Sequence, residues 1–389
     1  MNKTICSVMV AVFLILFLSC KKIGNKPPTI SFCYWKTTFA LDSTDASNLS
    51  KFGADHLYLR LFDIEWDIES KSPMPVAQCI QTYDSKCNTN LTPTIFITNS
   101  VFENIQENEL DTFAEKLTKK AINLREHIFD ESLREKIDND SNYIKFISNI
   151  KDWDKKSEFR DSIFDDKKAL FFNQNKEILI DCDWTPSTKA KYFKFLEILK
   201  IKMTDLEITS TLRLWQYRDF KLAGVPPVKK CLLMCYNLTD PRKYETENSI
   251  ATTEEFKKYI NHSNYPLKLD IALPIHNWAI YFRNNKYKGI INSIAVSEIK
   301  SNKELFEKIS DQKYMFLKDT VINETYYRYG DEFRIEQVEF KALLEFAQII
   351  KQYIKVDNTT RVTFFSWDAE FYNRFTKDEY KQILNTITE

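Results

Sequence analysis

The sequence predicts an α/β fold, a (β/α)8 barrel of the TIM type with long helical insertions after strands 3 and 7. Short runs rich in β-branched and aromatic residues recur along the chain and alternate with segments of helical periodicity. Eight such runs occur, which is the number of parallel strands that closes this barrel. A doubly wound sheet with an added helical domain is the alternative. We expect the strands at residues 29–35, 56–62, 93–99, 178–183, 208–214, 231–237, 267–273 and 362–367.

Helix signals follow several of these runs. After the fourth run, Thr185 and Pro186 offer a cap with proline at the first helical position, and an apolar stripe continues to residue 201. Thr252 opens a helix after the sixth run and Thr376 opens the last one, because each is followed by acidic residues that stabilise a helix N-terminus.

Two connections are far longer than a plain barrel needs. Residues 100–177 separate the third run from the fourth and show a helical, strongly charged pattern, and residues 279–360 separate the seventh from the eighth. Insertions of this kind are common in barrels, and those at the C-terminal face of the strands shape the substrate cleft. We therefore expect one barrel domain over residues 29–389 that carries both insertions.

The first 28 residues predict an exported chain held at a membrane. Lys3 supplies a positive charge, and residues 8–18 form an apolar run of eleven, shorter than the ~20 residues of a spanning helix. A small residue then precedes Cys20, which resembles a bacterial lipobox. The resemblance implies a signal peptide at 1–19, lipidation of Cys20, a polar tether at 20–28, and a place in the bacterial cell envelope, at the outer membrane or cell surface. An ordinary signal or anchor is the alternative.

The composition excludes several classes of function. The 55 basic and 55 acidic residues cancel, so the chain lacks the basic surplus that holds a nucleic acid. Its five glycines are widely spaced, which excludes the dinucleotide fingerprint, the P-loop and the Gly-x-Ser-x-Gly elbow, and its four histidines are too scattered for a zinc helix. No metal or organic cofactor is implied. Cys79 and Cys87 are the one local pair considered for a disulfide. The alternative is that all six cysteines after Cys20 are reduced and buried.

The strongest local signal for a functional site is a pair of aspartates at the end of the fourth run. Side chains alternate along a strand, so Asp181 and Asp183 share one face with Cα atoms ~6.5–7 Å apart. Two acids this close in a partly dry site repel each other, which raises the proton affinity of one of them. The alternative is a structural role in which the acids pair with Arg213 on the neighbouring run.

Three short segments resemble the family 18 glycoside hydrolases, the chitinase-like barrels. Asp181 and Asp183 match the second and third acids of that family's fourth-strand signature Asp-x-x-Asp-x-Asp-x-Glu, and Thr185 stands where the catalytic glutamate belongs. Residues 234–237 are similar to the sixth-strand Met-x-Tyr-Asp, with Asn237 in place of the aspartate. Trp367 ends the eighth run, where the family places a tryptophan under the reacting sugar.

The departures from the family pattern bear on activity. Threonine cannot donate a proton near neutral pH, and Asn237 can form hydrogen bonds but cannot ionise. Another acid would have to act, and the candidates are Asp63 and Glu65, which end the second run beside Asp67. A solvated acidic turn, or a site for a hard cation such as calcium, is the alternative for these three carboxylates.

Aromatic and amide side chains are abundant at the proposed strand ends. Sugars present apolar faces ringed by hydroxyls, so flat aromatic rings beside polar groups suit them. Asp270 within the seventh run is expected to form an interior salt bridge, and His276 beyond it is expected to be structural. The expected substrate-binding residues are Tyr236, Asn237, Trp367, Arg213, Gln216, Trp35, Trp184 and Trp278.

These signals together predict a membrane-anchored, carbohydrate-active barrel of glycoside hydrolase type that acts on or binds a glycan. In this hypothesis Asp183 assists, with Asp181 beside it, and Glu65 or Asp63 donates the proton. The alternative is a non-catalytic lipoprotein on a degenerate glycosidase scaffold that binds a glycan or another partner. A third hypothesis, favoured by the charged insertion at 100–177, is an envelope-assembly lipoprotein whose mouth binds a protein or peptidoglycan.

Overall fold

The computed structural model describes residues 28–82, 89–291 and 294–388. The expected signal peptide, Cys20 and all but the last residue of the tether lie outside these residues, and so does Cys87. Within the described part of the chain, every helix is too short or too polar to cross a membrane.

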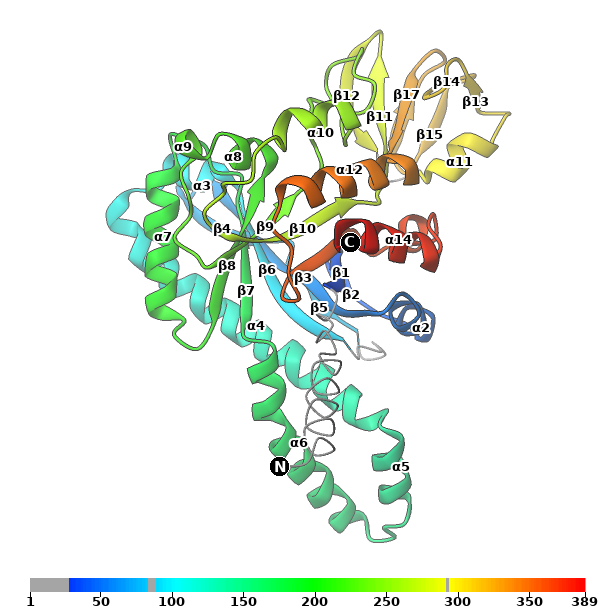
Figure 1. Ribbon diagram of the computed structural model, residues 1–389. Coiled ribbons are helices and arrows are strands. Elements are labelled where there is room, and N and C mark those ends of the chain that lie inside the picture. The colour runs from blue at the N-terminus through cyan, green and yellow to red at the C-terminus, as the bar shows by residue number, and fades with distance from the viewer. Residues whose placement is uncertain (1–27, 83–88, 292–293, 389) are drawn as a thin grey trace, which may run out of the picture.

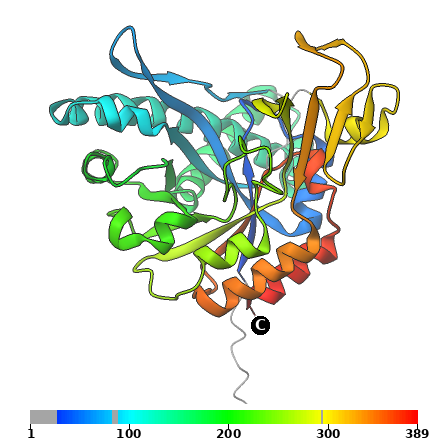
Figure 2. The same ribbon diagram turned by 90° about the horizontal axis from the view of Figure 1, so that it is seen from above.

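Eight parallel strands form a closed barrel (Figures 1 and 2). The strands follow the order β1-β18-β10-β9-β8-β7-β6-β3, and pairing between β1 and β3 closes the ring. Each predicted run overlaps one strand, so the fold class is confirmed, and the open doubly wound sheet is excluded. The barrel strands are β1 (Thr29–Tyr34), β3 (Ala54–Asp67), β6 (Asn90–Ile97), β7 (Glu177–Asp181), β8 (Glu207–Arg213), β9 (Lys230–Met234), β10 (Lys268–Pro274) and β18 (Arg361–Phe365).

Helices pack around the outside of the barrel because each has one apolar face. In α12 (Phe340–Tyr353), for example, Leu343, Phe346 and Ile350 are fully buried. The helix after β7 begins at Lys189, later than the cap expected at Thr185, because residues 185–188 form a separate turn. The other helices around the barrel are α2 (Ser43–Phe52), α7 (Lys189–Lys202), α8 (Leu214–Arg218), α9 (Phe220–Ala223), α10 (Thr253–Tyr259), α13 (Ala369–Tyr372) and α14 (Lys377–Thr388).

An ionic layer fills the base of the barrel, at the N-terminal ends of the strands. Asp270 is fully buried and accepts hydrogen bonds from the Tyr58 hydroxyl at 2.8 Å and the Arg361 backbone N–H at 2.8 Å. Lys230 lies 2.7 Å from Asp270 and 3.3 Å from Glu177, and Arg361 also pairs with Glu177. The structural salt bridge expected for Asp270 is therefore confirmed.

The insertion after β6 is helical throughout. Its elements are α3 (Asn99–Asn104), a short 3-10 helix (Glu107–Glu109), α4 (Leu110–Asp138), α5 (Ser141–Ser148) and α6 (Trp153–Gln174). The start of α4 packs on α7, whereas its end projects from the barrel together with α5 and α6 (Figure 1).

The insertion after β10 is mainly β-structure, which differs from the helical insertion expected there. Five antiparallel strands form a separate sheet in the order β12-β11-β17-β14-β13, with its own small apolar core around Phe316 and Phe333. The sequence signal was the apolar run within residues 277–283, followed by Asn284 and Asn285, whose positive φ angles of 51° and 60° make a tight hairpin turn. Its elements are β11 (Asn277–Arg283), β12 (Lys286–Ile291), α11 (Val296–Ser301), β13 (Phe306–Lys308), β14 (Lys313–Phe316), β15 (Thr320–Ile322), β16 (Thr325–Tyr327) and β17 (Glu332–Gln337).

Three short strands lie beside the barrel. β4 (Ser72–Val76) pairs antiparallel with the end of β3, so that β3 continues past the barrel as a two-stranded ribbon. β2 (Thr38–Phe39) pairs with β5 (Ile80–Gln81) near the same edge.

Candidate functional site

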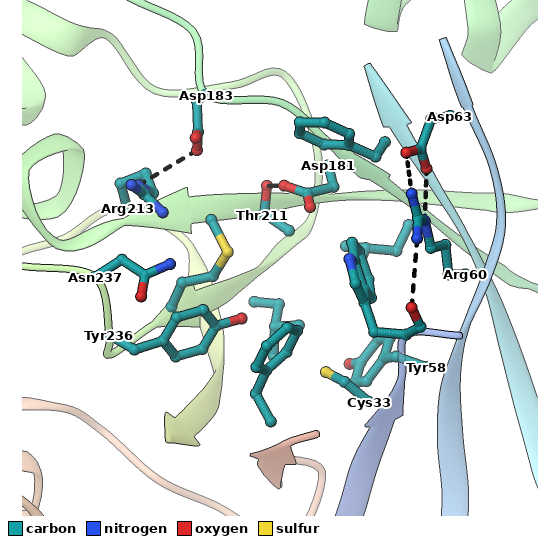
Figure 3. Close-up of a pocket in the computed structure, with 16 residues that line it drawn as sticks. Cys33, Tyr58, Arg60, Asp63, Asp181, Asp183, Thr211, Arg213, Tyr236 and Asn237 are labelled. Atoms are coloured by element: carbon teal, nitrogen blue, oxygen red, sulfur yellow. Dashed lines mark hydrogen bonds and ion pairs between the residues drawn. The ribbon is translucent and has the colours of Figure 1, made fainter. Parts of the chain in front are cut away.

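The C-terminal ends of the barrel strands surround a pocket of about 210 Å³. This volume is below the roughly 300–1,000 Å³ of typical small-molecule sites, so it holds about one ring-sized unit of a larger ligand. Seven of the predicted site residues line it, together with Phe365 and Arg60, which the sequence analysis did not single out (Figure 3). The seven are Trp35, Asp63, Asp181, Asp183, Arg213, Tyr236 and Asn237.

Asp181 is the buried acid of the site. It is the last residue of β7, it is 6% exposed, and one carboxylate oxygen accepts a hydrogen bond from the Thr211 hydroxyl at 2.7 Å. Burial raises the pKa of Asp181 to about 7, and the neighbouring charge of Asp183 adds to the rise, against a smaller opposing effect of Thr211 and Arg213. A substantial fraction of the molecules therefore carries a protonated Asp181 near neutral pH, as expected for one member of a close acidic pair.

Asp183 is the more open acid, with a side chain that is 45% exposed. Arg213 Nε lies 3.3 Å from its Oδ1, so the ion pair considered as the alternative for these acids forms with Asp183. That Oδ1 atom is buried yet accepts no hydrogen bond of good geometry. The same is true of Asn237 Oδ1, on a residue held at φ 57° just beyond β9. Asn237 Oδ1 is thus an unsatisfied acceptor, which costs free energy unless a donor reaches it, and Asp183 Oδ1 has the ion pair with Arg213 but no hydrogen bond.

Aromatic rings form one wall of the pocket. The ring of Tyr236 stacks on Phe365 with centroids 4.8 Å apart and an interplanar angle of 27°, and Phe365 lies 5.7 Å from Trp35. Burial raises the pKa of Tyr236 well above its usual value, so its hydroxyl remains a hydrogen-bond donor at physiological pH.

Trp367 does not line the pocket, and this prediction was wrong. It is 2% exposed, its ring stacks on Tyr372 at 4.2 Å, and its Nε1–H donates to Asp45 Oδ1 at 3.0 Å. The prediction failed because β18 ends at Phe365, after which the chain turns so that Trp367 points away from the barrel interior. Phe365 takes the place expected for the tryptophan, and its shared strand face with Arg361 and Thr363 was the signal that would have found it.

Trp184, Gln216 and Trp278 also lie outside the pocket lining, which corrects their expected roles. Trp184 is fully buried and donates from Nε1 to the Ala223 carbonyl at 3.0 Å. Gln216 is fully buried, donates to the Trp184 carbonyl at 2.8 Å and accepts from the Arg213 backbone N–H at 2.8 Å, so it holds the end of β8 at Arg213. Trp278 belongs to β11 and donates to a Glu336 carboxylate oxygen at 2.8 Å.

The two acids at the end of β3 behave differently. Glu65 is exposed on the ribbon with β4 and does not line the pocket, so it does not face Asp183 as proposed. Asp63 lines the pocket, but Arg60 donates to both of its oxygens, at 2.8 Å from Nε to Oδ1. A β-bulge between Arg60 and Phe62 turns both Arg60 and Asp63 toward the interior, although they are three residues apart.

The remaining polar candidates are structural. Asp67 accepts from the Ser70 backbone N–H at 2.7 Å in a turn, and no three His, Cys, Asp or Glu side chains of the described residues are grouped to hold a metal ion. His276 is buried beside Phe365, and burial lowers its pKa to about 4. Thr185 forms hydrogen bonds with Thr188 within the turn before α7 and is not the cap of that helix, because the N-cap position is taken by Thr188. Cys79 is free and buried.

Comparisons with known proteins find only distant likeness. No family model and no curated protein matches the chain. Among solved structures, the GH53 catalytic domain of Ignisphaera aggregans has a TM-score of 0.41 at 10% identity and covers 94% of this chain and 97% of its own. A xylanase-A-amylase inhibitor protein has a TM-score of 0.36 at 10% identity, covering 92% and 98%. The β-mannanase of the blue mussel Mytilus edulis has 0.33 at 8%, covering 93% and 92%. Likeness at this level adds nothing to what the strand order shows by itself.

Proposed function

We propose that this chain is a carbohydrate-binding barrel that takes one sugar unit of a glycan into the pocket at its mouth. The proposal rests on two features of the same pocket. One is the aromatic wall of Tyr236 and Phe365 beside Trp35, and the other is a pair of acceptor atoms without a hydrogen bond, on Asp183 and Asn237. Sugar hydroxyls donate hydrogen bonds to such acceptors, while the C–H face of a pyranose packs on flat rings.

The geometry supports binding better than it supports the mechanism of the chitinase-like family. Thr185 is engaged in its own turn, Glu65 is remote from the pocket, and Asp63 is held on both oxygens by Arg60. None of these residues is a free proton donor beside a bound sugar. Binding without cleavage is therefore the leading proposal.

Hydrolysis with Asp181 as the acid is the second candidate. It is favoured by one observation, the pKa of about 7 at Asp181, which keeps a transferable proton in the pocket near neutral pH. Removing the charge of the neighbouring acid by Asp183→Asn should lower the pKa of Asp181. If the second candidate is right, the alkaline limb of the pH–rate profile then moves to lower pH.

A glycan array followed by calorimetric titration with the best ligand tests the leading proposal. We expect Trp35→Ala to weaken binding by about tenfold or more, or ~1.4 kcal/mol, because it removes one stacking surface. Tyr329→Ala is the matched control, since that aromatic ring is 66% exposed and far along the chain in the second insertion. An array without binding, or equal loss in both variants, rejects the proposal. If the wild type produces new reducing ends from a glycan and Asp181→Asn does not, the second candidate, hydrolysis with Asp181 as the acid, is established instead.

We also propose that a lipid on Cys20 places the barrel at the outer membrane or surface of a bacterial cell. The support is the sequence pattern before Cys20. Fatty-acid labelling of the wild-type chain and of Cys20→Ser tests this proposal, and label that persists in the variant rejects it.

A further inference from the structure

The helical insertion carries an exposed apolar tip. At this tip, Ile144 and Phe146 on α5 are each 50% exposed, and Trp153 at the start of α6 is 77% exposed. Phe146 stacks on Phe159 of α6 with ring centroids 4.5 Å apart, so the tip is an ordered patch joining two helices. Tyr143 of α5 is buried against the insertion, about one turn before Phe146, and holds that short helix in place.

The projecting part of the insertion is a braced helical hairpin, which we call the arm (residues 126–171). Arg160 of α6 pairs with Asp138 of α4 at 2.6 Å, and Lys168 pairs with Asp130 at 3.0 Å. Cation–π contact between Arg134 and the Phe164 ring, at 4.1 Å, adds a third connection between the helices. The arm therefore holds its tip at a defined distance from the barrel.

The arm points away from the mouth and past the base of the barrel (Figure 1). Arg125 marks where α4 leaves the barrel, because it donates to the Asn175 carbonyl at 2.9 Å, and the Asn175 side chain accepts from the backbone of Leu91 near the start of β6. From Arg125 to the end of α4 at Asp138 are 13 residues, and at 1.5 Å per residue they carry the tip roughly 20 Å beyond the base.

The chain enters the barrel at the same end. Thr29 begins β1, nine residues after Cys20. Nine residues reach at most about 32 Å when fully extended. A lipid on Cys20 therefore keeps the bilayer surface within about 32 Å of the barrel base, the range into which the tip projects.

The charges around the tip suit a lipid surface. Four lysines and two aspartates lie at the tip, in residues 141–156, whereas the arm as a whole contains nine basic and twelve acidic residues, so the positive surplus is confined to the tip. Asp152 is used internally, because its side chain caps the N-terminus of α6. Exposed aromatic and aliphatic side chains flanked by lysines favour the boundary between lipid headgroups and acyl chains, where lysine stems reach toward the anionic headgroups.

We propose that the arm is a second membrane contact, in which Ile144, Phe146 and Trp153 insert into the bilayer that holds the lipid of Cys20. The proposal rests on the proposed anchor and is independent of glycan binding. With two contacts the mouth of the barrel faces away from the membrane at a fixed height, whereas a lipid on a nine-residue tether alone leaves the barrel free to tumble.

Tryptophan quenching by brominated lipids tests this contact in the full lipidated protein. The protein is reconstituted into vesicles of phosphatidylethanolamine and phosphatidylglycerol, with and without bromine on the acyl chains. The difference in emission between wild type and Trp153→Phe isolates Trp153. We expect this difference signal to fall by about half in brominated vesicles, since interfacial side chains lie ~5–10 Å deep.

Matched variants separate the possible outcomes. The emission difference between wild type and Trp66→Phe isolates Trp66, on the ribbon near the mouth, and it should show no quenching. The substitution Phe146→Asp should abolish the quenching of Trp153. Protein that floats with the vesicles while Trp153 stays unquenched overturns the membrane contact but leaves the anchor intact. Protein that does not float overturns both. Concentration-dependent shifts of Trp153 emission without vesicles assign the tip to contact between two copies, which also overturns the proposal.

Discussion

The buried acid of the pocket gives a prediction about the pH dependence of stability. Asp181 has a pKa of about 7 in the folded chain against 3.8 for the free side chain. The folded state therefore binds more protons than the unfolded state between about pH 4 and pH 7. The protonated carboxyl contributes its full stabilisation of the folded state below pH 4. This contribution falls as the pH rises and is lost as the pH passes 7.

The variant Asp181→Asn removes this loss. Asparagine has the same shape and still accepts the hydrogen bond of Thr211, but it does not ionise. A difference of about three pKa units corresponds to ~4 kcal/mol, an upper limit because a folded chain relaxes around a buried charge. We expect the variant and the wild type to have similar unfolding free energies at pH 4, and the variant to be more stable by up to this amount at pH 8.

Urea unfolding of both proteins at intervals from pH 4 to pH 8 measures the effect. Asp311→Asn is the control, because that side chain is fully exposed and should leave the unfolding free energy unchanged at every pH. A difference between Asp181→Asn and wild type that is constant with pH, or that favours the wild type at pH 8, refutes the assignment of Asp181 as the proton-holding acid.

Three further substitutions test the packing around the site. Trp367→Ala should lower the unfolding free energy by ~3–5 kcal/mol, as expected for a buried aromatic ring, and thermal denaturation with the ligand present should show that bound ligand still stabilises the variant. Arg361→Met should cost ~3–5 kcal/mol in urea unfolding, because it removes one of the two cations, Arg361 and Lys230, that neutralise two buried carboxylates at the barrel base. Gly224→Ala should cost ~1–3 kcal/mol, since its φ is +82° and an added Cβ would lie 2.7 Å from the Phe193 ring. A neutral result at any position, measured in the same unfolding assay, contradicts the packing described there.

The barrel could be predicted because its strands are short, mostly buried and separated by helices, which leaves a recognisable run for each strand. The second insertion could not, because β13 to β16 have only three or four residues each, which is too few to show a clear period. The apolar run within residues 277–283, followed by the turn at Asn284 and Asn285, was the usable signal for a β-hairpin.

Candidate residues next to strand ends were placed well where strand alternation decided the direction of the side chain. Asp181 and Arg213, at the ends of the adjacent strands β7 and β8, and Asp183, two residues beyond β7, were found in this way. The predicted positions of several tryptophans were wrong, because a residue near the end of a strand can follow a turn of the chain that the sequence does not reveal. Trp184 and Trp367 lie beyond such turns and donate their N–H groups within the protein. Arg60 was missed because a bulge, which no sequence pattern announced, aligns it with Asp63.

The ionic layer at the base of the barrel gives the pocket a single entrance. Glu177, Lys230, Asp270 and Arg361 fill the cross-section with interlocked charges, so there is no passage for a ligand between the two ends of the ring. A polymer therefore cannot be threaded through the ring. A ligand of this pocket enters and leaves from the C-terminal ends of the strands.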